Sequence, residues 1–113
     1  MPKTKATKQE VDVFLKTFKK SWPPSYYVVE RDENEEGLLI LEITPEHRKS
    51  EILALTYKNY DKGPEADKSG SSGEVWFFSK MVRGTKVYIK LKIWEGKNKK
   101  SYAKCMSFHP AKY

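Results

Sequence analysis

Residues 86–94, KVYIKLKIW, alternate strictly between apolar side chains and polar or aromatic ones. A period of two over this length predicts a half-buried strand whose apolar set faces a core. The apolar set is Val87, Ile89, Leu91 and Ile93. The opposite face, called the open face below, carries a phenol, two ammonium groups and an indole, from Tyr88, Lys90, Lys92 and Trp94. A plain solvated face mixes Ser, Thr, Glu and Lys, so this one is a candidate site.

Two similar stretches lie beside this strand in the sequence. They are VWFFSKMV (75–82) and SYAKCMSFH (101–109), and the links RGT and EGKNKK are short enough for hairpins. The C-terminal part is therefore predicted to form a three-strand antiparallel meander.

The N-terminal part is predicted to be mainly helical. Residues 7–20 form an amphipathic helix in which Thr7 and Glu10 are a candidate capping box. A second helix starts with Thr44 as N-cap and Pro45 at the first helical position, and it runs to about residue 55. Its buried side chains are expected to be Ile52, Leu53 and Leu55.

Three further segments complete the prediction. Residues 31–43 read as a strand or, preferably, as a helix capped by Asp32 or Asn34. SYYVVE (25–30) reads as a strand, and residues 56–74 read as a partly mobile surface loop. Together these elements predict one α+β domain over residues 1–113, with N-terminal helices packed on one face of a small antiparallel sheet.

The positive charge is concentrated in the C-terminal third of the chain. Residues 75–113 hold ten Lys and Arg against Glu95 alone, a net charge of +9, and the rest of the chain has twelve bases and fourteen acids, a net charge of −2. A one-sided basic region suits a phosphate polymer, because neutralising phosphates releases condensed counterions. The alternative is that this charge serves solubility alone.

Several classes of function find no support in the sequence. No stretch approaches the roughly 20 apolar residues of a membrane span, and no apolar signal-peptide core is present, so we expect a cytoplasmic protein without membrane contact. Cys105 is the one cysteine, which excludes an internal disulfide or zinc cluster and predicts a buried structural thiol. CxxC, HExxH and Gly-rich phosphate-binding motifs are absent, so we expect neither a metal nor a cofactor.

The 75–82 strand contributes one of two sets of side chains to the open face. The favoured set is Trp76, Phe78 and Lys80, and the other is Val75, Phe77 and Ser79. The favoured set places a cation beside Tyr88 and an aromatic ring on which a base could stack, as single-stranded RNA recognition requires. The predicted RNA contacts are Trp76, Phe78, Lys80, Arg83, Lys90 and Lys92. Alternatively, Trp76 and Phe78 belong to a second small core or a protein interface.

His109 ends the last strand and is a candidate for proton transfer, because an imidazole titrates near neutrality. RNA cleavage without a metal needs a group that removes the 2′-hydroxyl proton, cations that hold the phosphate, and an acid for the leaving 5′-oxygen. Lys, Tyr and His can fill these roles between them. The alternative for His109 is a structural role, and His47 is assigned none.

Three stretches, read in order, resemble the MqsR family of type II toxin–antitoxin toxins. They are LALTYKNYDKGPEAD (53–67), VWFFSKMVRGTKVYIKLKI (75–93) and KCMSFHPA (104–111). The resemblance implies a RelE-like fold, metal-independent cleavage of messenger RNA, and a cognate antitoxin protein as partner.

The resemblance also suggests catalytic residues. The family's catalytic lysine matches Lys62, and the tyrosine of its central strand matches Tyr88. The basic residue that closes the family's last strand is replaced by His109, and a family glutamine is replaced by Phe77. The leading hypothesis is therefore an endoribonuclease toxin acting on single-stranded mRNA. The alternatives are a module that binds RNA or a ribosome without cutting, and a protein that docks an acidic partner.

Overall fold

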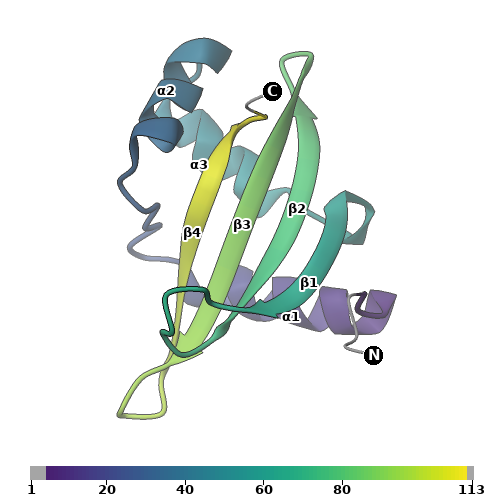
Figure 1. Cartoon of the computed structure of the whole chain (residues 1–113), viewed down its shortest axis with the longest axis vertical. Helices are drawn as coiled ribbons and strands as arrows, with labels where there is room; N and C mark the ends of the chain where they lie inside the picture. Colours follow the sequence, from purple (N-terminus) through teal and green to yellow (C-terminus); the bar gives the residue numbers. More distant parts are fainter. Residues whose placement is uncertain (1–4, 112–113) are drawn as a thin grey trace.

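Within residues 5–111, which the computed structural model describes, three helices accompany a four-stranded antiparallel sheet of order β1-β2-β3-β4 (Figure 1). The helices are α1 (Lys8–Ser21), α2 (Asp32–Leu41) and α3 (Pro45–Leu53), with a 3-10 turn η1 (Tyr57–Asn59). The strands are β1 (Tyr60–Ala66), β2 (Glu74–Val82), β3 (Thr85–Glu95) and β4 (Ser101–Pro110). The α+β class and the C-terminal meander are confirmed, and β1 adds a fourth strand. None of the helices in this described part is long and apolar enough to cross a membrane.

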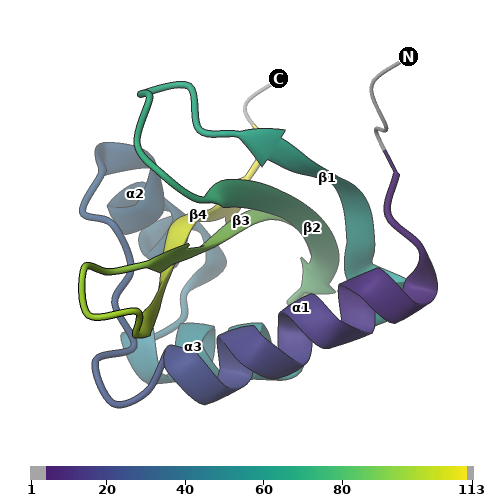
Figure 2. The same ribbon diagram turned by 90° about the horizontal axis from the view of Figure 1, so that it is seen from below.

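The helix α1 begins at the predicted capping box. The Thr7 hydroxyl accepts from the Glu10 backbone N–H (3.1 Å), and the Glu10 carboxylate accepts from the Thr7 N–H (2.8 Å). These bonds satisfy donors that the helix itself leaves unpaired. Thr44 caps α3 as predicted, by accepting from the His47 N–H. Figure 2 shows α1 and α3 on one side of the curved sheet, called the helix side below.

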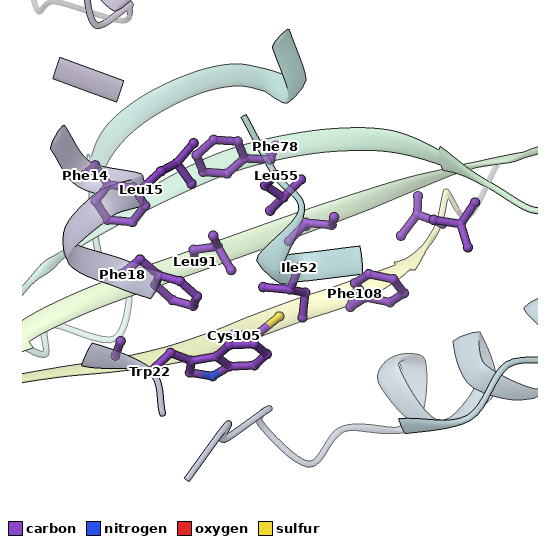
Figure 3. Packing of buried hydrophobic residues seen from close by; sticks show 14 of the residues in the cluster. Phe14, Leu15, Phe18, Trp22, Ile52, Leu55, Phe78, Leu91, Cys105 and Phe108 are labelled. Atoms are coloured by element: carbon purple, nitrogen blue, oxygen red, sulfur yellow. The ribbon is translucent and has the colours of Figure 1, made fainter. Parts of the chain in front are cut away.

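The core lies between these two helices and the sheet (Figure 3). Its buried side chains include Phe18, Trp22, Ile52, Leu91 and Phe108. Cys105 is fully buried among them, and burial raises the pKa of its thiol to about 12, so the thiol stays protonated. The predicted structural thiol is confirmed.

Two predictions of local structure are wrong. Residues 25–30 form no strand but a single bridge from Val28 to Cys105. Residues 60–66 of the predicted loop form the edge strand β1. The pairing of β1 with β2 shifts register twice between Tyr60 and Glu65, which removes the alternation by which strands are recognised. Gly63 lies at the irregular point with φ +112°, and a Cβ there would be 2.9 Å from the Val75 carbonyl oxygen, so this position requires glycine.

The helix α2 packs against the edge of β4 and not over the face of the sheet (Figure 2). Its predicted cap is wrong, because Arg31 is the N-cap and makes no side-chain capping bond. Asn34 is fully buried: its amide donates to the carbonyls of Val29 (2.8 Å) and Met106 (3.2 Å), and its oxygen accepts from the Phe108 N–H (2.9 Å). The Asn34 side chain therefore bonds backbone groups of β4 that no neighbouring strand pairs with. They lie next to the point where β4 shifts register against β3.

Gly37 allows α2 to come this close to β4. A Cβ at Gly37 would lie 3.0 Å from the Phe108 carbonyl oxygen and 3.1 Å from Cβ of His109. The helix therefore sets the surroundings of His109 at the end of β4.

Candidate nucleic-acid interface

The register between β2 and β3 decides which side chains share the open face. Trp76 is opposite Leu91 and Phe78 is opposite Ile89, so both aromatic residues lie on the helix side. Trp76 stacks on Phe14 with ring centroids 4.5 Å apart, and Phe78 is 1% exposed in the core. The prediction that Trp76 and Phe78 face outward for base stacking is wrong. The alternative of a second small core is wrong as well, because Phe78 belongs to the main core and Trp76 packs against it.

Lys80 also lies on the helix side, contrary to prediction. Its ammonium is 2.6 Å from a carboxylate oxygen of Glu51 in α3, and that carboxylate is 2.9 Å from Nε2 of His47. Burial opposes ionisation of Glu51, but the hydrogen bonds from Lys80 and His47 outweigh it and hold the pKa of Glu51 below its usual value. Lys80 therefore ties the sheet to α3 and does not face an RNA strand on the open face.

Arg83 lies at the tip of the β2–β3 hairpin. It has φ +50° and precedes Gly84 at φ +81° in a two-residue turn closed by the Val82–Thr85 pair. Its guanidinium is exposed, and its nearest carboxylate, Glu42, is 3.9 Å away. Arg83 is therefore accessible, but at the end of the sheet.

Phe77 occupies the place on the open face that was expected for the other aromatic residues of β2. It pairs with Lys90 on one side and with Lys62 of β1 on the other. The Lys62 ammonium is 4.6 Å from the centroid of the Phe77 ring, and the Lys90 ammonium is 5.4 Å from it. Two cations from different strands thus meet at one aromatic ring, which is an arrangement suited to a phosphate and its neighbouring base.

The next register position brings Ser79, Tyr88 and His109 together, one from each of three strands. Tyr88 is 37% exposed and His109 is half-buried. Nδ1 of His109 lies 2.9 Å from the carbonyl oxygen of Pro110, and because a carbonyl can only accept, Nδ1 carries the proton. In a neutral ring, Nε2 then carries the lone pair that can accept a proton. Lys62, Phe77, Tyr88, Lys90 and His109 are called the open-face cluster below.

Two hollows adjoin the cluster. One, of about 310 Å³, lies between His109 and α2 and is lined by Glu33 and Glu36. The other, of about 580 Å³, lies beside Phe77 and Met106. Five bases line it: Arg31, Lys62, Lys68, Lys90 and Lys104. Its acids Glu65 and Asp67 are paired with Lys62 (3.3 Å) and Lys92, so the second hollow attracts anions.

Lys92 does not offer its charge to solvent, although its register places it on the open face. Its side chain is 3% exposed and forms an ion pair with Asp67, which is 7% exposed. Asp67 also accepts from the backbone N–H (2.9 Å) and hydroxyl (2.7 Å) of Ser69. The prediction of Lys92 as an RNA contact is wrong, because Lys92 is covered. The connection between β1 and β2 crosses in front of the sheet (Figure 1), and Gly73 of this connection lies against the Lys92 side chain.

We expect Asp67→Asn to lower the urea midpoint of unfolding at neutral pH. The Lys92 ammonium, and then the bonds from Ser69, hold the pKa of Asp67 well below its usual value. A carboxyl group with a lowered pKa contributes stability above its unfolded pKa and loses that contribution as the pH falls through the folded one. The difference in urea midpoint between the wild type and Asp67→Asn should be constant down to about pH 5 and should narrow progressively below about pH 4.

The control for this comparison is Asp61→Asn, because Asp61 is exposed on β1. Its midpoint should match that of the wild type throughout. A gap between Asp67→Asn and the wild type that stays constant to pH 2 would show that Lys92 does not act through this carboxylate.

Comparison with protein-family models, curated proteins and solved structures finds no match to this chain. Among the described residues, no group of three or more His, Cys, Asp or Glu side chains is placed to hold a metal ion. The sequence placed Tyr88 and Lys90 correctly on the open face, but it put Phe77 in the set of β2 side chains that was not favoured for that face. Strand β2 is apolar on both faces, so its alternation does not say which set points outward.

Proposed function

We propose that this protein is an endoribonuclease toxin that cleaves single-stranded mRNA in the cytoplasm without a metal ion. The observation that supports this most is the open-face cluster, in which Lys62, Phe77 and Lys90 adjoin the Tyr88–His109 pair. A phosphate site beside proton-transfer groups is what 2′-hydroxyl attack requires. The resemblance to the MqsR toxins supports the same activity.

The cluster suggests a division of roles. Lys62 and Lys90 hold the scissile phosphate and stabilise the charge that develops on it. The 2′-oxygen attacks phosphorus and the bond to the 5′-oxygen breaks, which leaves a cyclic phosphate and a 5′-hydroxyl. Tyr88 and His109 together take the proton of the 2′-hydroxyl and supply one to the 5′-oxygen, with Nε2 of His109 as the accepting atom. Phe77 stacks a neighbouring base.

The test is incubation of the purified protein with a long, unstructured mRNA in the presence of EDTA. We expect cleavage by the wild type, and rates lower by about 100-fold or more in Tyr88→Phe and His109→Ala, the usual range for loss of a proton-transfer group. Tyr102→Phe and His47→Ala are matched controls, because both residues are partly exposed and lie outside the open-face cluster. Intact RNA with the wild type, or full activity in both cluster variants, would refute the mechanism.

A non-catalytic RNA- or ribosome-binding module is the second candidate, supported by the five bases around the hollow beside Phe77. Binding that weakens with salt and produces no cleavage would favour it. As a toxin, the protein would need a cognate antitoxin as partner. A short reading frame abutting its gene is the simplest sign of one.

A further inference from the structure

A groove of about 890 Å³ lies between α1 and the end of the sheet where β2 begins and β3 ends. Its walls include Val13, Phe14, Trp76, Ile93 and Trp94, and it is called the α1 groove below. Val13 is 59% exposed on its rim, although the other side of α1 supplies the core. Grooves of this size and apolar character are typical of sites that bind a ligand or a peptide segment.

Among the residues that the structure describes, the charged side chains that line the α1 groove are all acidic: Glu10, Glu74 and Glu95. This sign is opposite to that of the chain, which has 22 bases and 15 acids. Residues 75–113 contribute Glu95, their one acid, and none of their ten bases is among the groove's described lining residues. The α1 groove is therefore an acidic and apolar surface on a basic protein.

We propose that the α1 groove binds a basic, amphipathic segment of a partner protein. The apolar residues of that segment would pack against Val13, Trp76 and Trp94, and its Lys or Arg side chains would meet Glu74 and Glu95. Charge complementarity selects this occupant, since the carboxylates repel a phosphate backbone or an acidic peptide. A second copy of the chain also carries +7, so long-range repulsion opposes self-association.

The α1 groove and the open-face cluster use different surfaces. Trp76 and Phe14 lie on the helix side, whereas Phe77 and Tyr88 face the other way. Trp94 shares the open face with Tyr88, but it pairs with Tyr102 near the far end of β3, whereas Tyr88 pairs with His109. A partner in the α1 groove therefore leaves the open-face cluster accessible. This inference does not depend on RNA cleavage, and it predicts that a groove ligand and single-stranded RNA bind at the same time.

The three tryptophans provide a direct test by NMR of the indole N–H signals. Trp76 and Trp94 line the groove, while Trp22 is buried and donates its indole N–H to the Tyr27 carbonyl (2.9 Å). The probe is a short synthetic peptide of Leu and Lys, with Leu at positions i, i+3, i+4 and i+7. We expect it to shift the signals of Trp76 and Trp94 and to leave that of Trp22 unchanged. A matched Leu and Glu peptide should shift none.

Charge reversal at the groove should remove this binding. Both Glu74 and Glu95 are exposed. The double variant Glu74→Lys/Glu95→Lys should therefore lower the affinity for the Leu and Lys peptide by about tenfold or more. The control is Glu30→Lys/Glu35→Lys, which changes the net charge equally at exposed positions outside the groove. Val13→Ser should also weaken binding.

Three outcomes would overturn the proposal. The first is equal peptide affinity in the groove variant and the control variant. The second is a shift of the Trp76 and Trp94 signals by single-stranded RNA alone, which would place RNA in the α1 groove. The third is a result from sedimentation equilibrium in which the wild type is a dimer and Glu74→Lys/Glu95→Lys is a monomer. The groove would then be occupied by a second copy of the chain.

Discussion

Replacing Phe77 by Leu is expected to weaken the binding of single-stranded RNA by about 10-fold to 100-fold, the usual cost of losing one base–aromatic stack. Phe77 is the ring on which the ammonium groups of Lys62 and Lys90 converge, so a base seated there lies next to both cations. Leu keeps the apolar contact with the sheet and removes the π-face. The measurement is the dissociation constant of a labelled oligonucleotide at fixed salt.

Lys62 and Lys90 should contribute to RNA affinity through the salt dependence of binding, which Phe77 does not affect. Lys62→Gln/Lys90→Gln should reduce the slope of log affinity against log salt by about 1.4, because each phosphate contact on a single strand contributes about 0.7. Phe77→Leu should leave that slope unchanged.

Matched controls come from the far end of the same sheet. Lys97→Gln/Lys99→Gln removes the same charge from the exposed β3–β4 hairpin, and Tyr102→Leu removes an exposed ring. If these variants weaken binding as much as the cluster variants do, the basic surface binds RNA diffusely and Phe77 is no stacking site.

The sequence predicted β3 and α1 well because each has one apolar face and one polar face. Strand β2 is apolar on both faces, so its alternation did not show which set faces outward. Trp76 and Phe78 were therefore expected on the open face, where the structure has Phe77. Strand β1 was missed because Gly63 and two register shifts interrupt its alternation. The burial of Lys92 depends on Asp67, a loop residue far away in the sequence, and a local pattern carries no information about such a partner.

The Lys62–Phe77–Lys90 contact could be inferred only in part. Tyr88 and Lys90 follow from the alternation of β3, and His109 follows from its place at the end of β4. Lys62 was suggested by resemblance, and it reaches the open face because β1 pairs with β2 at Phe77. The register of β2 against β3 explains why Phe77, and not Trp76, makes the contact on the open face.

Replacing Asn34 by Ala is expected to lower the free energy of unfolding by about 3 kcal/mol, because three backbone groups around this buried side chain lose their partner and each unpaired group costs about 1–3 kcal/mol. These groups are the carbonyls of Val29 and Met106 and the N–H of Phe108. Asn34 is also the side chain that fastens α2 to β4. Its loss should therefore disturb His109, which lies against Gly37 of the same helix. Urea unfolding followed by circular dichroism measures the effect.

Asn59→Ala is the matched control, because the Asn59 side chain accepts one bond, from the Thr56 N–H (3.0 Å), at the partly exposed turn η1. A loss of about 1 kcal/mol is expected there. RNA cleavage by Asn34→Ala, assayed where the variant is still fully folded, separates the two consequences. Reduced cleavage would show that α2 positions His109. Unchanged cleavage, together with the full loss of stability, would show that the end of β4 holds His109 without help from α2.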